Sequence, residues 1–373
     1  MNTPLAGLRV LDFSTLLPGP FATLYLADLG ADVIHIESPT RPDLVRIMPP
    51  YANGQATAHS YLNRNKQSIT LDLKDRASIE KIYAKIQEVD IVVEQFRPGV
   101  MTRLGLDYAT LSALNPALIY CSITGYGQTG TYRDRAGHDI NYVALSGIAG
   151  YGGRKTSGPP PLGIQIADVA GGSLHAVIGI LTAVIERSKS GLGQHVDISM
   201  TDCAAGLNAM SAAATLAAEE PPRAESEVLN GGSFYDYYET ADGRYFSIGG
   251  LEPQFIQALA VALDLPILAQ KAASFLDDDR LAVKAALKDK IKSKTWEQWR
   301  EIFASLDVCA EPVLYLEEAL NSELAVERNW SVQVPLASDS EKVERQLACP
   351  IKFSRSEAQY RFTGQTLGAG RWD

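Results

Sequence analysis

The stretch RVLDFSTLLPGPFATLYLADLGADVIHIE, residues 9–37, decides the fold class. An apolar strand pattern over Arg9–Phe13 is followed by a loop, a helical pattern over Phe21–Leu29 and a second strand pattern over Ala31–Glu37. Gly30 stands where the helix should end, because glycine readily adopts the left-handed conformation of a helix C-terminus. A strand, a helix and a strand in this order predict a parallel crossover unit.

The same alternation continues along the chain. Strand patterns at Ser68–Leu73, Asp90–Glu94 and Leu118–Ile123 alternate with helical patterns at Arg76–Gln87 and Met101–Leu114. We therefore expect an α/β fold with a Rossmann-like, doubly wound parallel sheet.

A nicotinamide cofactor is the weaker interpretation of this first unit. Its loop contains Pro18-Gly19-Pro20 in place of the GxGxxG that cradles a pyrophosphate. Glu37 is therefore interpreted as an ordinary acid at a strand end, and no redox cofactor is expected.

A second domain is indicated beyond the polar stretch Glu219–Arg223. Strand patterns at Tyr235–Thr240 and Arg244–Ile248 flank Ala241-Asp242-Gly243, which predicts a hairpin, and Pro253 suits the first position of a helix. We expect a large α/β domain at residues 1–200, a linker at 201–223, a smaller α+β domain at 224–312, a return linker at 313–329 and a C-terminal segment at 330–373 that completes the large domain.

Composition limits the possible partners. The net charge of −10 over 373 residues argues against nucleic acid, and an anionic ligand would need a local basic pocket. The four cysteines form no CxxC pair, so neither a metal site nor a disulfide framework is indicated. The N-terminus, Met1–Leu5, has no signal-peptide pattern and no apolar run approaches about 20 residues, so we expect a cytoplasmic protein without a membrane partner.

The sequence Gly137-His138-Asp139-Ile140-Asn141-Tyr142 places one of five histidines in a glycine-flanked loop. If Asp139 caps the following helix, the positive end of that helix would keep the imidazole neutral and able to accept a proton near pH 7. The alternative is a histidine that holds the loop through hydrogen bonds. The residues alone leave both interpretations open.

A second candidate follows a Gly/Pro-rich loop, in Ala167-Asp168-Val169-Ala170-Gly171-Gly172. Aspartate is a favoured N-cap, and capping would lower the pKa of Asp168. The two glycines favour the close approach of a ligand instead, and free N–H groups at a helix start can stabilise a negative oxygen. Our hypothesis is that His138 and Asp168 act on opposite faces of one carbon acid.

Glu252 is ambiguous in the same way, because it stands directly before Pro253 at the start of a predicted helix. It is either a residue at a helix start or a carboxylate that orients and charges the histidine.

Three motifs carry a family resemblance: the Gly137–Tyr142 and Ala167–Gly172 motifs and Leu251-Glu252-Pro253-Gln254-Phe255. They resemble the signatures of the α-methylacyl-CoA racemases, within the family III CoA-transferase (CaiB/BaiF) superfamily. The likeness extends to Pro4–Leu11, Asp28–Val33 and Phe96-Arg97-Pro98-Gly99-Val100, and so covers nearly the whole chain.

The resemblance implies a racemase that moves a proton at the α-carbon of a 2-methylacyl-CoA thioester, without a redox or metal cofactor. By motif, His138 and Asp168 would be the two acid/base groups, and Glu252 would pair with the histidine. The N–H groups that open the Asp168 helix would suit the enolate oxygen.

The resemblance also implies a coenzyme A site in the large domain. Arg97, Leu73 and Lys74 are expected near the adenine and phosphates, and Gly137, Asp139 and Tyr142 along the pantetheine arm. Related racemases carry an arginine near the end of the second strand, where this chain has Glu37-Ser38-Pro39. Arg41, Arg46 or Arg64 are the candidates to replace it.

The family's fold implies an interlocked homodimer, in which Glu252 could act across the interface. Two alternatives remain. A family III CoA-transferase would use Asp168 as a nucleophile and would need neither His138 nor Glu252. A non-catalytic CoA-binding protein would need none of the three.

Overall fold

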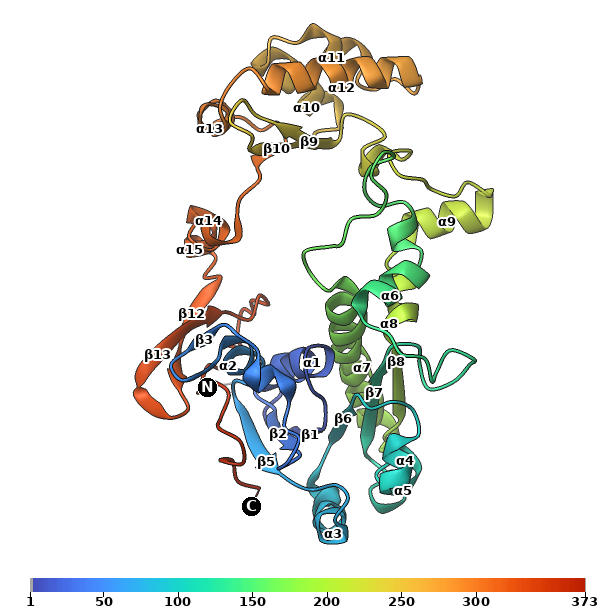
Figure 1. Ribbon diagram of the computed structural model, residues 1–373, viewed down its shortest axis with the longest axis vertical. Coiled ribbons are helices and arrows are strands. Elements are labelled where there is room, and N and C mark those ends of the chain that lie inside the picture. The colour runs from blue at the N-terminus through green and yellow to red at the C-terminus, as the bar shows by residue number, and fades with distance from the viewer. Residues whose placement is uncertain (1–2, 373) are drawn as a thin grey trace. The chain divides into compact units, whose positions relative to one another are not determined.

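The computed structural model divides into two compact units (Figure 1). Unit 1 comprises Met1–Ser146, Leu162–Leu207 and Glu323–Asp373, and unit 2 comprises Gly147–Pro161 and Asn208–Ser322. The structure describes residues 3–372, so Met1, Asn2 and Asp373, which belong to the predicted N-terminal and C-terminal segments, lie outside the described residues. The predicted domain boundaries stay a prediction.

Unit 1 is built on a six-stranded parallel sheet. Its strand order is β5-β2-β1-β6-β7-β8. The strands are β1 (Arg9–Asp12), β2 (Asp32–Glu37), β5 (Lys66–Thr70), β6 (Ile91–Glu94), β7 (Ile119–Thr124) and β8 (His195–Ser199). Counted along the chain, this is the order 3-2-1-4-5-6 of a doubly wound Rossmann-like sheet. The predicted α/β fold with a parallel sheet is confirmed.

Helices cover both faces of this sheet. On one face α3 (Arg76–Lys85), α4 (Val100–Leu104) and α5 (Tyr108–Leu114) bury apolar side chains against the strands. On the other face lie α1 (Pro18–Asp28) and α7 (His175–Ser190). The predicted single helix over Met101–Leu114 is wrong, because Gly105 adopts φ +73 and ends α4.

The predicted helix at Asp168 begins one residue earlier. A π-helical segment, η4 (Ala167–Leu174), continues directly into α7, and Asp168 makes no N-cap hydrogen bond. The interpretation of Asp168 as an N-cap is therefore wrong. By length and hydropathy alone, the run Ala167–Ser190 could cross a membrane, but core helices pass the same test and this one packs against β7 and β8.

Gly171 and Gly172 serve helix packing. A Cβ at Gly171 would lie 2.9 Å from the carbonyl oxygen of Met200, the first residue of α8 (Met200–Gly206). A Cβ at Gly172 would lie 3.0 Å from the Met200 side chain and 3.3 Å from Pro18. The expectation that these glycines admit a ligand is therefore wrong, because α1 and α8 occupy that space.

Buried charges lie at the ends of β1 and α1 and at the start of β5. Arg64, 1% exposed, donates from Nε to Asp28 at 2.9 Å. Lys66 is equally buried and lies 3.4 Å from Asp12, while it donates to the carbonyl oxygen of Pro20 at 2.9 Å. Such charges stay in the core only because each has an opposite charge and further hydrogen bonds.

The last residues of the chain pack along this edge of the sheet. The N–H of Arg361 donates to the side chain of Asn65 at 2.7 Å, and the N–H of Gly370 donates to the carbonyl oxygen of Ser68 at 2.8 Å.

The other helices and strands of unit 1 are β3 (Tyr51–Ala52), β4 (Gln55–Ala56), α2 (Thr57–Leu62), α6 (Asp139–Leu145), α15 (Glu323–Glu327), β12 (Ser331–Leu336) and β13 (Asp339–Leu347).

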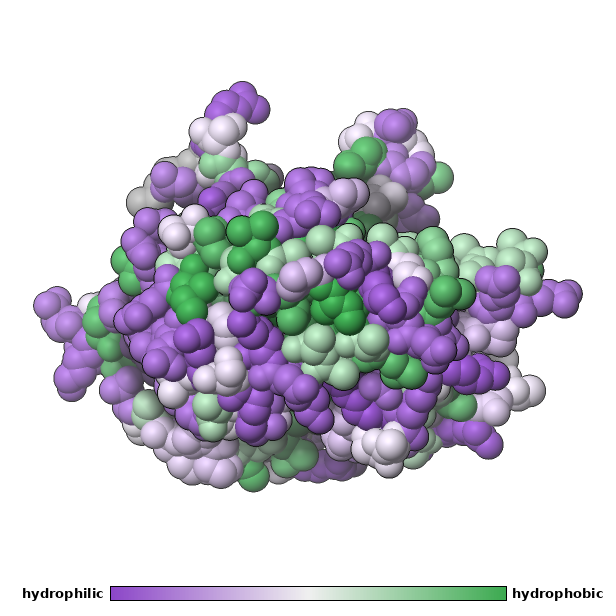
Figure 2. All heavy atoms as spheres, turned by 90° about the horizontal axis from the view of Figure 1, so that it is seen from above, coloured by the Kyte–Doolittle hydropathy of each residue, from purple (hydrophilic) through white to green (hydrophobic). Residues whose placement is uncertain are grey.

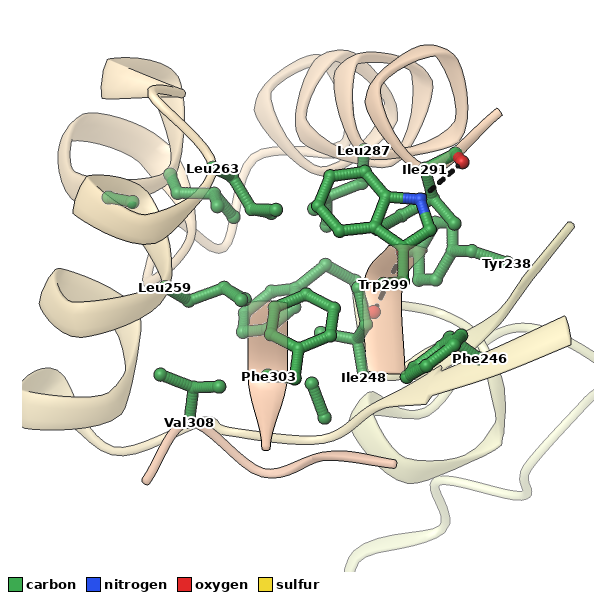
Figure 3. Close-up of a cluster of buried hydrophobic side chains, with 14 of the residues drawn as sticks. Tyr238, Phe246, Ile248, Leu259, Leu263, Leu287, Ile291, Trp299, Phe303 and Val308 are labelled. Carbon is green, nitrogen blue, oxygen red and sulfur yellow. Dashed lines mark hydrogen bonds between the residues drawn. The ribbon is translucent and has the colours of Figure 1, made fainter. Parts of the chain in front are cut away.

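Unit 2 packs helices on a three-stranded antiparallel sheet in the order β11-β10-β9. The predicted hairpin is confirmed, since β9 (Asp236–Glu239) pairs antiparallel with β10 (Tyr245–Ile248). Its other elements are α9 (Ala209–Ala218), α10 (Pro253–Ala262), α11 (Pro266–Lys271), α12 (Asp277–Ile291), α13 (Trp296–Phe303), β11 (Ala310–Pro312) and α14 (Leu316–Leu320). In its core, Trp299 donates from Nε1 to the carbonyl oxygen of Ile291 at 2.7 Å (Figure 3).

Many apolar side chains remain exposed in the single chain. Figure 2 shows green, apolar residues interspersed with purple, polar ones on one face. On α7, Ile178 and Ile185 are each 60% exposed, so only one side of this helix is buried. Helix α9 buries no residue at all. Its apolar residues Met210 and Leu216 are 77% and 85% exposed.

The packing role of Gly171 can be tested by adding a methyl group. Gly171→Ala would place Cβ against the Met200 backbone, which cannot move freely, and we expect it to lower the free energy of unfolding by about 1–3 kcal/mol. Urea denaturation followed by circular dichroism measures this. Gly206→Ala, where nothing lies within 4 Å, is the matched control. An unchanged stability of Gly171→Ala would contradict the packing role.

Candidate active site

A cavity of about 440 Å³ opens at the carboxyl ends of the central strands of unit 1. Strand order reverses between β1 and β6, and ligands of doubly wound folds bind at this switch point, beyond the carboxyl ends of the strands. The lining follows this rule, because residues 16–18 come shortly after β1 and residues 95–98 come directly after β6. Residues of the segment 123–142, together with Asp168 and Met200, also line the cavity.

His138 and Asp168 both line this cavity, although 29 intervening residues separate them in the chain. His138 is exposed and is itself the N-cap residue of α6, where its N–H donates to Oδ1 of Asn141 at 3.0 Å. The expectation that Asp139 caps this helix is wrong, because Asp139 is its first residue.

Asp139 instead caps the start of η4. Its Oδ1 accepts hydrogen bonds from the N–H groups of Ala167 at 2.7 Å and Asp168 at 3.0 Å. These hydrogen bonds hold the loop of His138 against the start of η4. They also occupy two of the N–H groups that were expected to stabilise an enolate oxygen, so that expectation is wrong for these two groups.

The carboxyl group of Asp168 has a perturbed pKa. Burial, and then the nearby negative charge of Asp139, raise the pKa of Asp168 to about 6, although His138 opposes the shift. The expectation that helix capping lowers this pKa is wrong, because Asp168 caps no helix and is partly withdrawn from water. Asp168 can therefore both bind and release a proton near neutral pH.

Tyr142 is a further residue of the cavity wall. Its hydroxyl donates to the carbonyl oxygen of Gly137 at 2.6 Å, and burial and then Asp168 raise the pKa of Tyr142 to about 12. A Cβ at Gly137 would lie 2.6 Å from the Tyr142 ring, so only glycine lets the loop pack this closely. These contacts fix the residue before His138.

The predicted coenzyme A residues separate into two groups. Arg97, Gly137 and Tyr142 line the cavity, whereas Asp139 acts through its hydrogen bonds to η4. Leu73 and Lys74 do not line the cavity: Leu73 packs on the α3–α5 core, and Lys74 is exposed. Their predicted contact with a nucleotide stays a prediction.

Sequence reasoning missed several polar residues of the cavity wall, among them Gln95, Arg133, Arg135 and Asn141. The signal for two of them was present, because Arg133-Asp134-Arg135 brings two cations to a glycine-containing loop directly before the His138 motif. Arg135 stacks on Tyr132, with its guanidinium carbon 4.1 Å from the ring centre. Positive charge therefore gathers locally on an acidic chain.

Three arginines were expected to replace the one that this chain lacks after β2. Two of them already form ion pairs. Arg64 is buried on Asp28. Arg46 pairs with Glu37 through Nη2 and also donates to the carbonyl oxygen of Gln365 at 2.9 Å. Of the three candidates, Arg41 alone is exposed and forms no ion pair with a described residue.

Glu252 belongs to unit 2, where it is exposed at the N-cap position of α10. Pro253 is the first residue of that helix, as predicted, and the Glu252 side chain makes no cap hydrogen bond. Its pairing with His138 stays a prediction. No group of three or more His, Cys, Asp or Glu side chains could hold a metal ion within residues 3–372.

Comparison with known proteins identifies the family. Residues 5–370 match the family model described as CoA-transferase family III. The chain belongs to this family. The resemblance drawn from the motifs is thus confirmed.

Curated family III relatives of this chain have two kinds of activity. The alpha-methylacyl-CoA racemase of Mus musculus is 36% identical over 87% of this chain and 81% of the relative. The succinate–glutarate CoA-transferase of Agrobacterium fabrum is 32% identical over 98% of this chain and 93% of the relative. The crystal structure of a CAIB/BAIF family protein from Brucella suis covers 99% of this chain and 97% of its own, with a TM-score of 0.85 and 31% identity. Both racemases and CoA-transferases are therefore similar to this chain.

The contribution of Asp139 to the pKa of Asp168 can be measured. Asp139→Asn removes the negative charge but keeps an oxygen that can accept the two N–H groups, so we expect the pKa of Asp168 to fall from about 6 towards that of an ordinary aspartate. Carbon-13 NMR of labelled carboxyl groups, with Asp168→Asn for assignment, reads this pKa. Asp134→Asn, an exposed carboxylate in the same loop, is the control. An unchanged pKa in Asp139→Asn would contradict this coupling.

Proposed function

We propose that the protein is a racemase or epimerase of 2-methylacyl-CoA thioesters. The observation that carries the proposal is that His138 and Asp168, an imidazole and a carboxyl group, line one cavity at the switch point of the sheet. Two different proton carriers in one cavity suit a reaction in which a proton leaves one face of a carbon and another arrives at the opposite face.

The proposed reaction needs only the thioester and the two side chains. One group takes the α-hydrogen as a proton, and the electron pair of the C–H bond moves to the thioester oxygen as an enolate. The conjugate acid of the other group then donates a proton to the same carbon, which returns the electron pair and inverts the centre. For the opposite enantiomer, His138 and Asp168 exchange roles.

The pKa of Asp168 supports this exchange of roles. A general base and a general acid work best when their pKa values lie near the working pH. At about 6, the pKa of Asp168 falls in the range in which imidazole groups exchange protons in proteins. An ordinary aspartate has a pKa of about 3.9 and carries almost no proton near neutral pH, so it would return a proton to the carbon far less readily.

The enolate oxygen needs hydrogen-bond donors other than the N–H groups taken by Asp139. Side-chain amides of the cavity wall are the candidates. Gln95 accepts the N–H of Gly19 through Oε1 at 2.8 Å, and Asn141 accepts the N–H of His138 through Oδ1 at 3.0 Å. In both residues the NH₂ group is left to donate, and we infer that one of them holds the developing negative oxygen.

A CoA-transferase is the second candidate, because transferases are among the similar proteins and Asp168 lies in the cavity. Asp168 would then attack the thioester carbonyl, form an acyl anhydride and release the CoA thiolate. This reaction uses Asp168 as a nucleophile and leaves His138 without a chemical step.

The two candidates differ in their need for the imidazole. We expect His138→Ala and Asp168→Asn each to slow α-proton exchange by at least about 100-fold, because each variant loses one of the two acid/base groups. Wild type and variants are incubated with one enantiomer of a 2-methylacyl-CoA in deuterated water, and deuterium uptake is followed by mass spectrometry together with loss of optical purity. His175→Ala, outside the cavity wall, is the control.

Each outcome selects one function. Deuterium uptake that requires both residues supports the racemase. Transfer of CoA to a free acid that survives His138→Ala, with Asp168 trapped by hydroxylamine, supports the transferase instead. Neither reaction in the wild-type protein would leave a CoA-binding protein without catalysis.

We also propose a homodimer. The exposed apolar side chains of α9 and α7 support it, since an apolar helix that buries no residue is unusual on the surface of a monomer. In such a dimer Glu252 could pair with His138 of either subunit.

Light scattering after gel filtration tests the assembly. We expect a mass of twice 40.4 kDa at micromolar concentration, and we expect the double variant Met210→Glu, Leu216→Glu to shift the protein towards the monomer, because it places charge in the buried interface. A wild-type monomer at these concentrations would contradict the proposal.

A further inference from the structure

The chain between His138 and Asp168 leaves unit 1 and returns to it. Helix α6 ends at Leu145, residues Gly147–Pro161 belong to unit 2, and the chain is back in unit 1 before η4 starts. We call Gly147–Pro161 the inserted loop. Its two ends therefore lead to the two candidate acid/base groups.

Arg154, in the middle of the inserted loop, binds a carboxylate of β9. Its Nη1 and Nη2 donate to the two carboxylate oxygens of Asp236 at 2.7 and 2.6 Å, and Nη1 also donates to Glu225 at 3.2 Å. Asp236 is the first residue of β9, and its side chain is only 8% exposed. A guanidinium that contacts both oxygens of one carboxylate forms the strong, directional kind of ion pair.

Apolar packing contributes little to the position of the inserted loop. All fifteen of its residues are described by the structure, none of them is buried, and five are glycine. The N–H of Lys155 donates to Glu225 at 2.9 Å, and the Tyr151 hydroxyl donates to Asn208 at 2.7 Å. A segment so rich in glycine has many accessible conformations, so the inserted loop depends on its polar contacts for a fixed position.

The same stretch of chain is closed at its base by Asp139, which accepts the N–H groups of Ala167 and Asp168. These hydrogen bonds close a longer loop that runs from α6 to η4 and has the inserted loop at its tip. Closing a loop costs conformational entropy, and the cost is larger when the tip moves freely. Fixing the tip on Asp236 therefore favours the closed base.

We propose that Arg154 is a positioning residue for the candidate active site. By holding the inserted loop on Asp236, it keeps the two Asp139 hydrogen bonds formed and so keeps His138 and Asp168 at one cavity. Arg154 is not among the described residues that line this cavity, so it acts through the backbone and not on the substrate. The consequence for catalysis rests on the proposed function, whereas the state of the hydrogen bonds can be measured without any reaction.

Hydrogen exchange of the Ala167 and Asp168 amides tests the proposal directly. We expect Arg154→Ala to speed the exchange of these amides about tenfold, because the base opens more often once the tip is released. Mass spectrometry of short overlapping peptides around Ala167 measures the rates. Arg154→Lys, which keeps a cation that can reach Asp236, should restore most of the protection.

Activity gives a second readout of the same variant. We expect Arg154→Ala to lower kcat for α-proton exchange about tenfold and to change KM by less than about twofold, since no residue of the cavity wall is removed. The pKa of Asp168 should also fall from about 6 as the negative charge of Asp139 moves away from it. An arginine that only stabilised unit 2 would leave this pKa unchanged.

Two matched variants distinguish the inserted loop from the rest of unit 2. Lys284 of α12 also pairs with Asp236, at 2.8 Å, but it does not belong to the inserted loop. Lys284→Ala therefore removes an ion pair from the same carboxylate and should leave the amides of Ala167 and Asp168 protected as in the wild type. Asp236→Asn weakens the contact with Arg154 from the other side, and it should speed exchange as Arg154→Ala does.

The outcomes separate this inference from the proposed function. Wild-type exchange rates in Arg154→Ala overturn the positioning role, and so does an equal increase in Lys284→Ala, which would reflect a general loosening of unit 2. Faster exchange in an active enzyme whose kcat is unchanged by Arg154→Ala overturns it as well. Faster exchange in Arg154→Ala and Asp236→Asn, but not in Lys284→Ala, upholds it. If the wild type then exchanges no α-proton of an acyl-CoA, only the proposed function is refuted.

Discussion

The site depends on one carboxylate that has no chemical role in the proposed reaction. Asp139 accepts the N–H groups of Ala167 and Asp168 and thereby joins the start of α6 to the start of η4. His138 directly precedes Asp139, and Asp168 is itself one of the two donors, so these hydrogen bonds bring both side chains to one cavity. The same negative charge raises the pKa of Asp168, which couples the position of this group to its protonation.

The sequence predicted the architecture of unit 1 well, because strands buried on both faces of a parallel sheet are nearly continuous apolar runs. The order of those runs and the helices between them determined the class. What the sequence could not show was the use of each polar group. Aspartate suits a helix N-cap anywhere, and only the fold shows that Asp139 serves the start of η4 while the Asp168 side chain caps nothing. Gly171 and Gly172 were misread for the same reason, since a glycine that admits a ligand and one that admits a neighbouring helix are identical in sequence.

Charge shows a similar limit. The positions of Arg46 and Arg64 made them plausible phosphate ligands, but their partners Glu37 and Asp28, 9 and 36 residues away in the chain, can be identified only in the fold. Arg133 and Arg135 gave the opposite error, because they line the cavity although arginines in a loop resemble ordinary surface charge. Which arginines form internal ion pairs and which line the cavity could not be decided without the distances to their counter-charges.

The C-terminal residues that bond to Asn65 and Ser68 have a consequence for how the chain acquires its structure. The edge of the parallel sheet is completed by residues that follow unit 2 in the chain, whereas unit 2 is almost continuous and precedes them. During synthesis unit 2 can form its core while the edge strand β5 still lacks the later residues that pack on it. A chain that stopped at Tyr360 would thus leave the buried charges at this edge open to water, although no residue of the cavity wall would be missing.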